Sequence, residues 1–414
     1  MIKHSPRAAR RALAIAGNCA LAIGALALAG CGTSSHETGT VPAHHSSAAF
    51  RSALATAHGT PASFSVLSMT FVSDLNGYVL GTVECHSGRC ASVLNTTDGG
   101  AHWARVKAPT VHPGGRFNVC PTHQPCVAQI RFVTPLTGYA FDPSLFLTTD
   151  GGAHWRQLHG LSVTSLEAAG GAAGNAVRVA SKGQGCSGQP YKVQSAQVGA
   201  NTWHLLPAPP ILMICPPTLY RQGQRLALAD YGNPAGGVRA LAGIEVSNNG
   251  GANWKHVADE CGGKDGYAAQ VTIAPPNVLV LLCRHQMSNS HGDFGTAWVR
   301  VSTDDGATFG PDRQVVATHG FPTKAVFAYQ IAAASASRLI VVATTAHGSK
   351  AYVSQNGGRT WKSELTVAGR GVDQSSSILL VGFTDPLTAR IAQGGLVWTT
   401  VSGGERWKAD QFKS

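Results

Sequence analysis

The hydrophobic and polar positions of this chain change character twice. Residues 12–30 form one apolar run rich in Ala and Leu, and residues 32–62 are small, polar and poor in bulky apolar side chains. From Phe64 onward, short β-branched and apolar runs are broken by Gly, Pro, Asn and Asp, and no long 3.6-residue period appears. Such short runs bounded by turn residues predict an all-β fold for the rest of the chain.

One octet recurs along this strand-rich part. Thr-Thr-Asp-Gly-Gly-Ala-His-Trp occurs at residues 96–103 and again at 148–155, and related octets end at five further aromatic residues. The seven closing aromatics are Trp103, Trp155, Trp203, Trp254, Phe309, Trp361 and Trp407, spaced 46 to 55 residues apart; the copy ending at Trp203 is decayed and one residue longer. A repeat of this length suits blades of four strands. The spacing therefore predicts a seven-bladed β-propeller with four-stranded antiparallel blades over residues 63–414.

The residue types of the octet fit a tight turn. A Ser or Thr hydroxyl and an Asp or Asn side chain accept hydrogen bonds from the turn's own backbone amides, and Gly adopts the positive φ that a hairpin needs. The aromatic ring is expected to begin the next strand and to be buried against the blade. We therefore interpret the octet as scaffold, with a calcium or sugar site as the alternative.

A second repeated element precedes some octets. The stretches "FVSDLNGYVLG" (71–81), "FVTPLTGYAF" (132–141) and "GFTDPLTARIA" (382–392) each predict a first strand, a turn and a second strand. Blade seven has Ala389-Arg390 where the other two have Gly-Tyr.

Together these motifs resemble known families. The octet resembles the Asp-box, Ser/Thr-x-Asp-x-Gly-x-Thr-Trp, of BNR-repeat propellers, and Phe-x-x-x-Leu-x-Gly-Tyr followed by an Asp-box resembles the photosystem II assembly/stability-factor branch of the sialidase-like superfamily. The resemblance implies that each octet joins the third and fourth strands on the rim, away from the ligand face. The residues to which it assigns a structural role are Asp98, Trp103, Asp150, Trp155, Trp254, Asp304, Phe309, Trp361 and Trp407.

The amino terminus predicts export. Lys3, Arg7, Arg10 and Arg11 precede the apolar run, as in a signal peptide, and Leu28-Ala29-Gly30-Cys31 resembles a bacterial lipobox. We expect residues 1–30 to be a lipoprotein signal peptide, Cys31 to be lipidated, and residues 31–62 to be a flexible tether. The protein would then be extracytoplasmic and lipid-anchored to a bacterial membrane. An ordinary N-terminal membrane helix is the alternative.

Of the ten cysteines, Cys19 lies in the predicted signal peptide and Cys31 is the predicted lipidation site. The other eight are an even number, as expected for disulfides in an exported protein. Cys85 with Cys90 and Cys120 with Cys126 are predicted to be local bridges, and Cys186 with Cys215 and Cys261 with Cys283 are the expected longer ones. Zinc is the alternative, but the spacings lack paired C-x-x-C motifs, so we assign no metal site.

The charge excludes one class of partner. Residues 1–30 hold four of the 32 Lys and Arg and none of the 21 acids, so the remaining chain carries a net charge of +7. No run of five basic residues and no basic-aromatic signature indicates nucleic-acid binding. No phosphate-loop or cofactor motif is present, and we expect no cofactor.

In this propeller the loops after the second strands open on the face opposite the octets, and the eight cysteines map to that face. We expect the ends of the second strands to surround the mouth of the propeller's central channel on this face, which defines a candidate binding face of Glu84, Asp142, Lys182, Asp230, Arg284 and His285. His285, His291 and Asp293 could together ligate a metal, but in a loop rich in Ser, Asn and Gly we interpret them as solvated residues.

These features favour a non-catalytic binding or assembly scaffold for a protein or an envelope polymer. The alternative is a glycan-active propeller, either sialidase-like or another glycoside hydrolase, which needs two carboxyl groups about 5–10 Å apart. Several carboxylates lie on the candidate face, but none is marked by a motif, and the Arg-Ile-Pro motif of the sialidases is absent. We assign no catalytic residue. The sequence leaves open whether blade seven closes the ring by packing on blade one or through a strand from residues 46–60.

Overall fold

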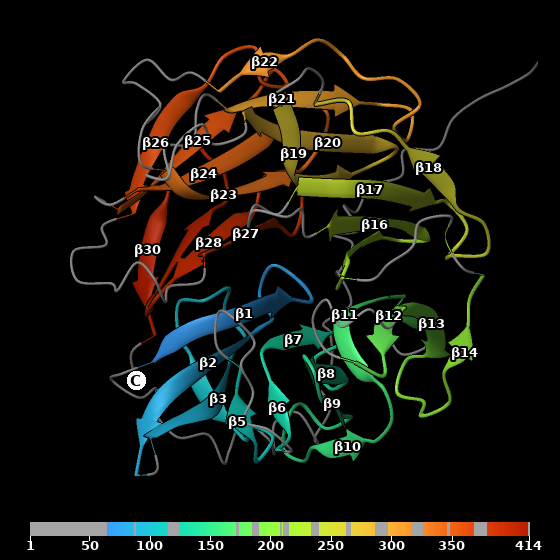
Figure 1. The fold of residues 1–414 in the computed structure, drawn as a ribbon. Coiled ribbons are helices and arrows are strands. Elements are labelled where there is room, and N and C mark those ends of the chain that lie inside the picture. Colours follow the sequence, from blue (N-terminus) through green and yellow to red (C-terminus); the bar gives the residue numbers. More distant parts are fainter. Residues whose placement is uncertain are drawn as a thin grey trace, which may run out of the picture. The chain divides into compact units, whose positions relative to one another are not determined.

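A computed structural model describes most of the chain from Phe64 onward: residues 64–86, 88–114, 124–170, 174–183, 190–207, 209, 215–232, 240–261, 266–285, 297–315, 326–345, 348–367 and 379–412. Within these ranges the chain forms strands and turns, and no helix is present (Figure 1). Consequently the described residues include no helix with the length and apolar character to cross a bilayer.

Seven four-stranded antiparallel sheets are formed in chain order, and we call them blades one to seven. Blades one and two are β1 (Ser65–Phe71), β2 (Gly77–Cys85), β3 (Gly88–Thr96), β4 (Ala104–Val106), and β7 (Gln129–Phe132), β8 (Gly138–Phe141), β9 (Leu145–Thr148), β10 (Arg156–Leu158). Blades three and four are β11 (Ser162–Ala169), β12 (Asn175–Ser181), β13 (Lys192–Gln197), β14 (His204–Leu205), and β15 (Thr218–Gln222), β16 (Arg225–Gly232), β17 (Ala240–Ser247), β18 (Lys255–Val257). Blades five and six are β19 (Gly266–Ala274), β20 (Val278–His285), β21 (Ala297–Ser302), β22 (Arg313–Gln314), and β23 (Val326–Ala333), β24 (Leu339–Thr345), β25 (Gly348–Ser354), β26 (Lys362–Val367). Blade seven is β27 (Leu379–Phe383), β28 (Ala389–Gln393), β29 (Leu396–Thr400) and β30 (Lys408–Gln411), while β5 (His112–Pro113) and β6 (Cys126–Val127) form a small parallel pair.

The blades form a ring, which confirms the predicted seven-bladed propeller (Figure 1). The first strands are innermost: from β1 to β23, each contacts the first strand of the next blade, and the ring is completed by a contact between β1 and β28 of blade seven. Each blade packs between two others, so its middle strands are buried on both faces; seven consecutive residues of β2 are buried. Burial on both faces is why these strands are continuously apolar rather than alternating.

Polar bridges tie neighbouring first strands together. In β1, β11 and β19 a bulge directly precedes a polar residue whose oxygen accepts a hydrogen bond from a backbone N–H of the next blade's first strand. These bonds run from Ile130 to Ser68 (3.1 Å), from Leu219 to Ser165 (3.0 Å) and from Ile331 to Gln270 (3.0 Å).

The octets form the turns between third and fourth strands, as predicted. In blade one the Thr96 hydroxyl accepts a hydrogen bond from the Gly100 N–H (2.9 Å), and Asp98 accepts one from the His102 N–H (2.9 Å). Gly99 and Gly100 have φ values of 78° and 103°, a conformation that favours glycine. The turn also docks on its own blade, because the Gly99 N–H donates to Leu75 O (2.9 Å) between β1 and β2. The octet is therefore a structural turn in this protein.

The decayed octet of blade three lacks this network. Ala196 stands where the other octets have a hydroxyl residue. The turn keeps the bond that docks it on its own blade, which runs here from the Val198 N–H to Gly174 O (2.9 Å). Tyr139 of blade two accepts a further bond from the Gly199 N–H (2.9 Å).

The Gly-Tyr pairs of blades one and two contact the next blade. A Cβ at Gly77 would lie 2.4 Å from the Phe71 ring, so only glycine fits beneath that ring. Tyr78 stacks on Phe132 of blade two (3.5 Å between centroids) and donates a hydrogen bond to Pro135 O (2.7 Å). The Gly-Tyr motif is thus a contact between blades.

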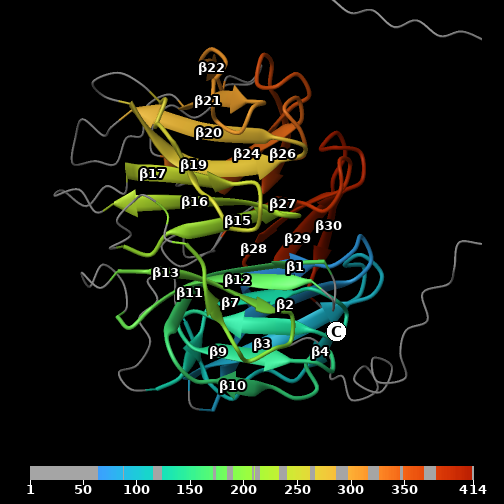
Figure 2. The same ribbon diagram turned by 90° about the vertical axis from the view of Figure 1, so that its right-hand side faces the viewer.

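Blade seven closes on blade one by face packing. Phe412 meets Phe64 and Trp103 at centroid distances of 4.9 and 5.2 Å, and the Val66 N–H donates to Gly394 O (2.9 Å). Arg390 replaces the tyrosine at this junction: its Nη2 donates to Asp74 O (2.6 Å) of blade one. Figures 1 and 2 both show blade seven beside blade one. The alternative, a strand from residues 46–60, lies outside the described residues.

Two predicted disulfides are confirmed. Cys85 is bonded to Cys90 and Cys261 to Cys283, with Cα–Cα distances of 5.9 and 5.4 Å. Cys126 and Cys215 are also disulfide-bonded. The cysteines predicted to pair with these two, Cys120 and Cys186, lie outside the described residues, as does Cys31.

Candidate functional site

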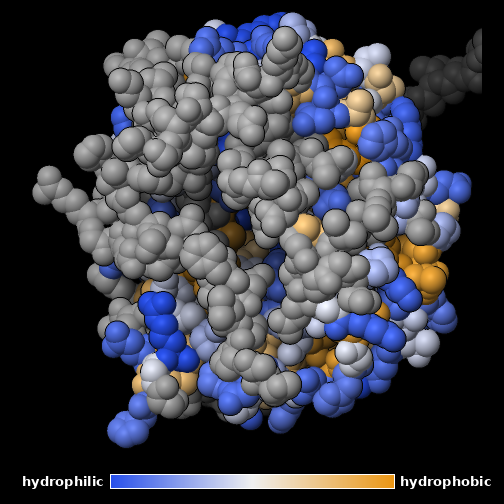
Figure 3. Space-filling model, viewed as in Figure 1, coloured by the Kyte–Doolittle hydropathy of each residue, from blue (hydrophilic) through white to orange (hydrophobic). Residues whose placement is uncertain are grey.

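A cavity of about 670 Å³ lies between the first strands of blades one, two, three, four and seven. In the view of Figure 1, the face of the molecule has a hollow near its centre, where both hydrophilic and hydrophobic residues are visible (Figure 3). The cavity is built by the innermost strands because these strands face the ring axis.

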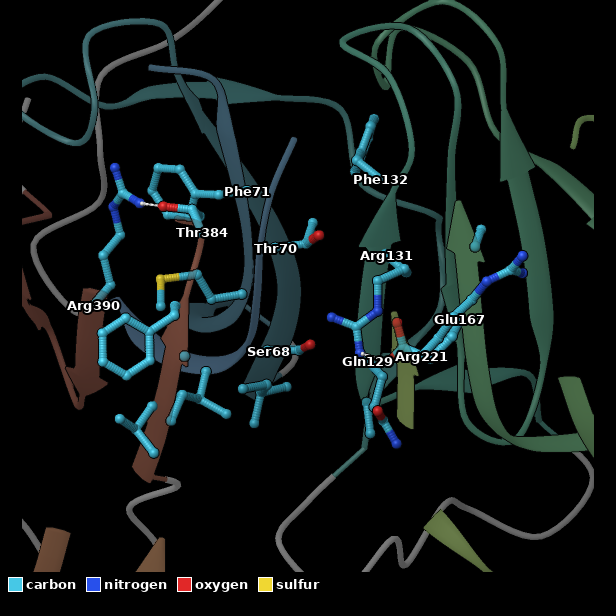
Figure 4. A pocket seen from close by; sticks show the side chains of 18 of the residues that line it. Ser68, Thr70, Phe71, Gln129, Arg131, Phe132, Glu167, Arg221, Thr384 and Arg390 are labelled. Carbon is cyan, nitrogen blue, oxygen red and sulfur yellow. Dashed lines mark hydrogen bonds and ion pairs between the residues drawn. The ribbon is translucent and has the colours of Figure 1, made fainter. Parts of the chain in front are cut away.

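One wall of the cavity is largely apolar. It comes from β1 and β27, and its apolar side chains are Leu67, Met69, Phe71, Leu380, Val381 and Phe383. Two hydroxyl residues on β1, Ser68 and Thr70, interrupt it and face the opposite wall (Figure 4).

The opposite wall is charged. Arg131 on β7 donates from Nη2 to Glu167 Oε1 on β11 at 2.7 Å, and both side chains are mostly buried. Arg221 on β15 is held by Asn175, with Nη2 at 2.5 Å from Oδ1 and Nη1 at 2.8 Å from the backbone oxygen. Figure 4 shows Arg131 and Gln129 across the cavity from Ser68 and Thr70. The two walls therefore differ in chemistry.

Burial shapes the electrostatics of this wall. Burial raises the pKa of Glu167, and the nearby Arg131 and Arg221 guanidiniums partly offset that rise. Burial likewise lowers the pKa of Arg221, against the attraction of Glu167. The whole cavity lining holds three arginines, Arg131, Arg221 and Arg390, and two acidic residues, Glu167 and Asp142, so it keeps a small positive excess that favours an anionic group.

Arg390 marks the junction between blades seven and one at the edge of the cavity. Its guanidinium carbon lies 3.6 Å from the centre of the Phe71 ring, and the residue is only 2% exposed. Burial lowers its pKa to about 10, while Asp74 and Asp385 act in the opposite direction. Because Arg390 also donates a hydrogen bond to Asp74 O of blade one, it stabilises the junction that closes the ring.

Of the six predicted face residues, Asp142 is the one that lines this cavity. Its Oδ2 accepts a hydrogen bond from Gln129 Nε2 (3.2 Å). Glu84 and Lys182 are exposed at the ends of their strands, Arg284 is half-buried, and the side chain of His285 lies outside the described residues.

Asp230 is a buried residue among the six. It is 4% exposed within β16, and its Oδ1 accepts no hydrogen bond from the described residues. Burial raises its pKa to about 6. It is thus a buried carboxyl group, away from the residues that line the cavity.

The site predicted from the sequence did not include Arg131, Glu167 or Arg221. The prediction was based on the ends of the second strands, which lie one strand further from the ring axis than the first strands do. The available signal was a charge inside a short apolar strand, as in "QIRF", "SLEAA" and "TLYRQ". Within the described residues, no three His, Cys, Asp or Glu side chains converge as a metal site requires.

The protein is thus a seven-bladed β-propeller whose central cavity has one apolar wall and one charged wall. No protein-family model matches the chain, and a search of curated proteins found no match. Among solved structures, the chain is similar to YCF48 bound to D1 peptide (TM-score 0.53, 16% identity, 84% of this chain and 96% of that chain). It is also similar to YCF48 from Cyanidioschyzon merolae (TM-score 0.52, 14% identity, 83% and 98%). A polysaccharide lyase of family PL25, an ulvan lyase bound to a GlcA–Rha3S saccharide, is a third neighbour (TM-score 0.54, 10% identity, 86% and 96%). At these identities the likeness shows the propeller fold alone.

Proposed function

We propose that this protein is a non-catalytic binding propeller whose central cavity receives a segment of a partner protein. We further propose that lipidated Cys31 anchors it to a bacterial membrane outside the cytoplasm. The observation that carries the cavity proposal is the pairing of an apolar wall on blades one and seven with a guanidinium-bearing wall on blades two to four. A segment with an apolar side chain on one side and a carboxylate on the other satisfies both walls.

A peptide ligand fits the size and the chemistry of the cavity. Its volume of about 670 Å³ is in the range of small-ligand pockets, enough for a few residues of an extended chain. The fold neighbour YCF48 has been described with a D1 peptide bound, which supports a peptide as the class of ligand.

The two cavity carboxyl groups favour binding over hydrolysis. Glu167 is ion-paired with Arg131, and Asp142 accepts a hydrogen bond from Gln129. A glycosidase needs one carboxyl group that donates a proton and a second that acts as base or nucleophile. A carboxylate engaged as a counterion is poorly placed for either role. The glycan-active alternative draws support from the raised pKa of Glu167 and from the ulvan lyase among the fold neighbours.

The test is capture of a partner from native envelope by the full-length protein in detergent. The variant Arg131→Gln with Glu167→Gln removes the ion pair without changing net charge. Lys182→Gln, an exposed residue outside the cavity, is the control. We expect one stoichiometric protein partner with the wild type and the control, and at least a tenfold weaker affinity for the double variant.

Equal capture by the double variant would contradict binding in the cavity. Recovery of a polysaccharide alone would favour the polymer alternative. Release of cleaved saccharide from it by the wild type, and not by the double variant, would overturn the non-catalytic assignment.

A further inference from the structure

The outer strand of blade one is much shorter than the strand beside it. β3 has nine residues, whereas β4 has three and pairs only with Val93, Leu94 and Asn95. Residues 88–92 of β3 therefore have no outer strand paired with them among the described residues; β5 contacts β3 but pairs only with β6. Blade six shows the covered arrangement, because β26 pairs with β25 from Val353 to Ser349.

A groove opens beside this uncovered edge. Beyond Val106 the chain leaves the sheet, and a cavity of about 600 Å³ lies between Cys90 and Ala91 on one side and residues 105–111 on the other. Ala91, Val106, Ala108 and Val111 belong to the hydrophobic core cluster shared by blades one and two. The floor of the groove is thus apolar, and it is separate from the central cavity.

The edge is held in strand conformation without an outer partner. β2 and β3 pair along their whole length, from Gly77 opposite Thr96 to Cys85 opposite Gly88. The disulfide between Cys85 and Cys90 links the two strands near their tip. On the other side of the groove, Lys107 O accepts a hydrogen bond from Trp155 Nε1 of blade two (2.9 Å). Rigid walls of this kind lower the ordering cost of binding.

We propose that residues 88–92 of β3 form a docking edge for an extended, acidic segment of a partner protein. The segment adds to the sheet where the second half of β4 is missing, and it places an apolar side chain in the groove. Backbone groups on an uncovered strand edge supply hydrogen bonds to the added strand, and the alternating side chains supply specificity.

The positive charge of the groove favours an acidic segment as its ligand. Arg105 and Lys107 line the groove, and none of the described lining residues is acidic. Arg89 is exposed on the same edge, opposite the exposed Glu84 of β2. The chain's own residues 32–62 contain one Glu, one Arg and four His, so they carry no negative excess to match this edge. An acidic segment of another protein does match it.

The test uses a fluorescein-labelled hexapeptide that alternates Glu and Val, with the same peptide N-methylated at each Val as the strand-blocking control. Binding to the full-length protein in detergent is followed by fluorescence polarisation, and amide hydrogen exchange locates the site. We expect slower exchange in residues 88–92 and no binding of the N-methylated peptide. We also expect at least tenfold weaker binding to Arg105→Glu with Lys107→Glu, a loss of about 1.4 kcal/mol.

Three further variants make the result specific. Lys182→Glu with Lys192→Glu changes the charge equally at exposed positions of blade three and should leave binding unchanged. Ala108→Leu fills the groove without changing charge and should weaken binding, with thermal melts confirming that each variant is folded. Arg131→Gln with Glu167→Gln should have no effect, which separates this edge from the central cavity. No binding at millimolar peptide, unchanged exchange in residues 88–92, or equal loss in the blade-three control would each overturn the proposal.

Discussion

Asp230 makes the stability of the propeller depend on pH in an unusual direction. Its carboxyl group is 4% exposed and accepts no hydrogen bond at Oδ1 from the described residues, so burial disfavours the charged form and raises the pKa to about 6. The ordinary value is 3.8. A group whose pKa is raised by folding stabilises the folded state below its unfolded pKa, and that stability is lost as the pH rises through the folded pKa.

The magnitude follows from the shift. A pKa raised from 3.8 to about 6 corresponds to about 3 kcal/mol of folding free energy between the fully protonated and fully ionised limits. The loss should take place between about pH 4 and pH 7. Asp230→Asn keeps the shape and removes the ionisation, so this variant should be more stable than the wild type at pH 8 by up to about 3 kcal/mol. At pH 4 the two proteins should have nearly equal stability.

The assay is urea unfolding of the wild type and of Asp230→Asn at several pH values between 4 and 8. The control is Asp385→Asn. Asp385 Oδ1 accepts backbone hydrogen bonds from Leu387 (2.6 Å) and Thr388 (2.9 Å), and its pKa is lowered to about 2 although burial acts to raise it. Its contribution is present at neutral pH and is lost as the pH falls through 2, so this variant should be less stable at neutral pH. A difference between wild type and Asp230→Asn that is the same at pH 4 and pH 8 would refute the reasoning.

Three further predictions test the packing, the closure and the anchor. Trp361 is 3% exposed in the core between blades five and six, so Trp361→Ala should lower the free energy of unfolding by roughly 3–5 kcal/mol; a melting temperature unchanged within about a degree would contradict this. Arg390→Gln removes the charged hydrogen bonds to Asp74 O and Gly99 O that join blades seven and one and should cost about 2–3 kcal/mol, measured by denaturant unfolding; no loss would show that ring packing alone closes the propeller. Cys31→Ser should move the protein from the membrane fraction to the soluble fraction, and a variant that stays with the membrane would favour the N-terminal helix alternative.

Local interactions made the fold predictable from the sequence. In the octet, Thr96 bonds to Gly100 and Asp98 to His102, so each turn is encoded within eight residues. Seven copies at a near-constant spacing then predict the number of blades, and the structure confirms it. The pairs Cys85–Cys90 and Cys261–Cys283 were also predictable, because they link strands or loops that lie close in the chain.

The contacts between blades were visible only as motifs. The repeated Gly-Tyr pair stood out in the sequence, but its purpose depends on the neighbouring blade: Tyr78 stacks on a ring and binds a carbonyl 54 and 57 residues away. Arg390 occupies the same place in blade seven and reaches Asp74, 316 residues earlier. No local pattern encodes such a distance.

The sequence by itself determined the repeat, the turn chemistry, two of the disulfides and the predicted exported character of the chain. Tertiary structure decided where charged side chains meet. Arg131, Glu167 and Arg221 belong to three blades and face one cavity because ring closure turns first strands toward a common axis. The predicted face residues stand at the ends of second strands, one strand further out, and among them Asp142 lines this cavity. The alternation of side chains between the two faces of a strand depends only on the local sequence. Which strand becomes innermost depends on how the seven blades pack against one another.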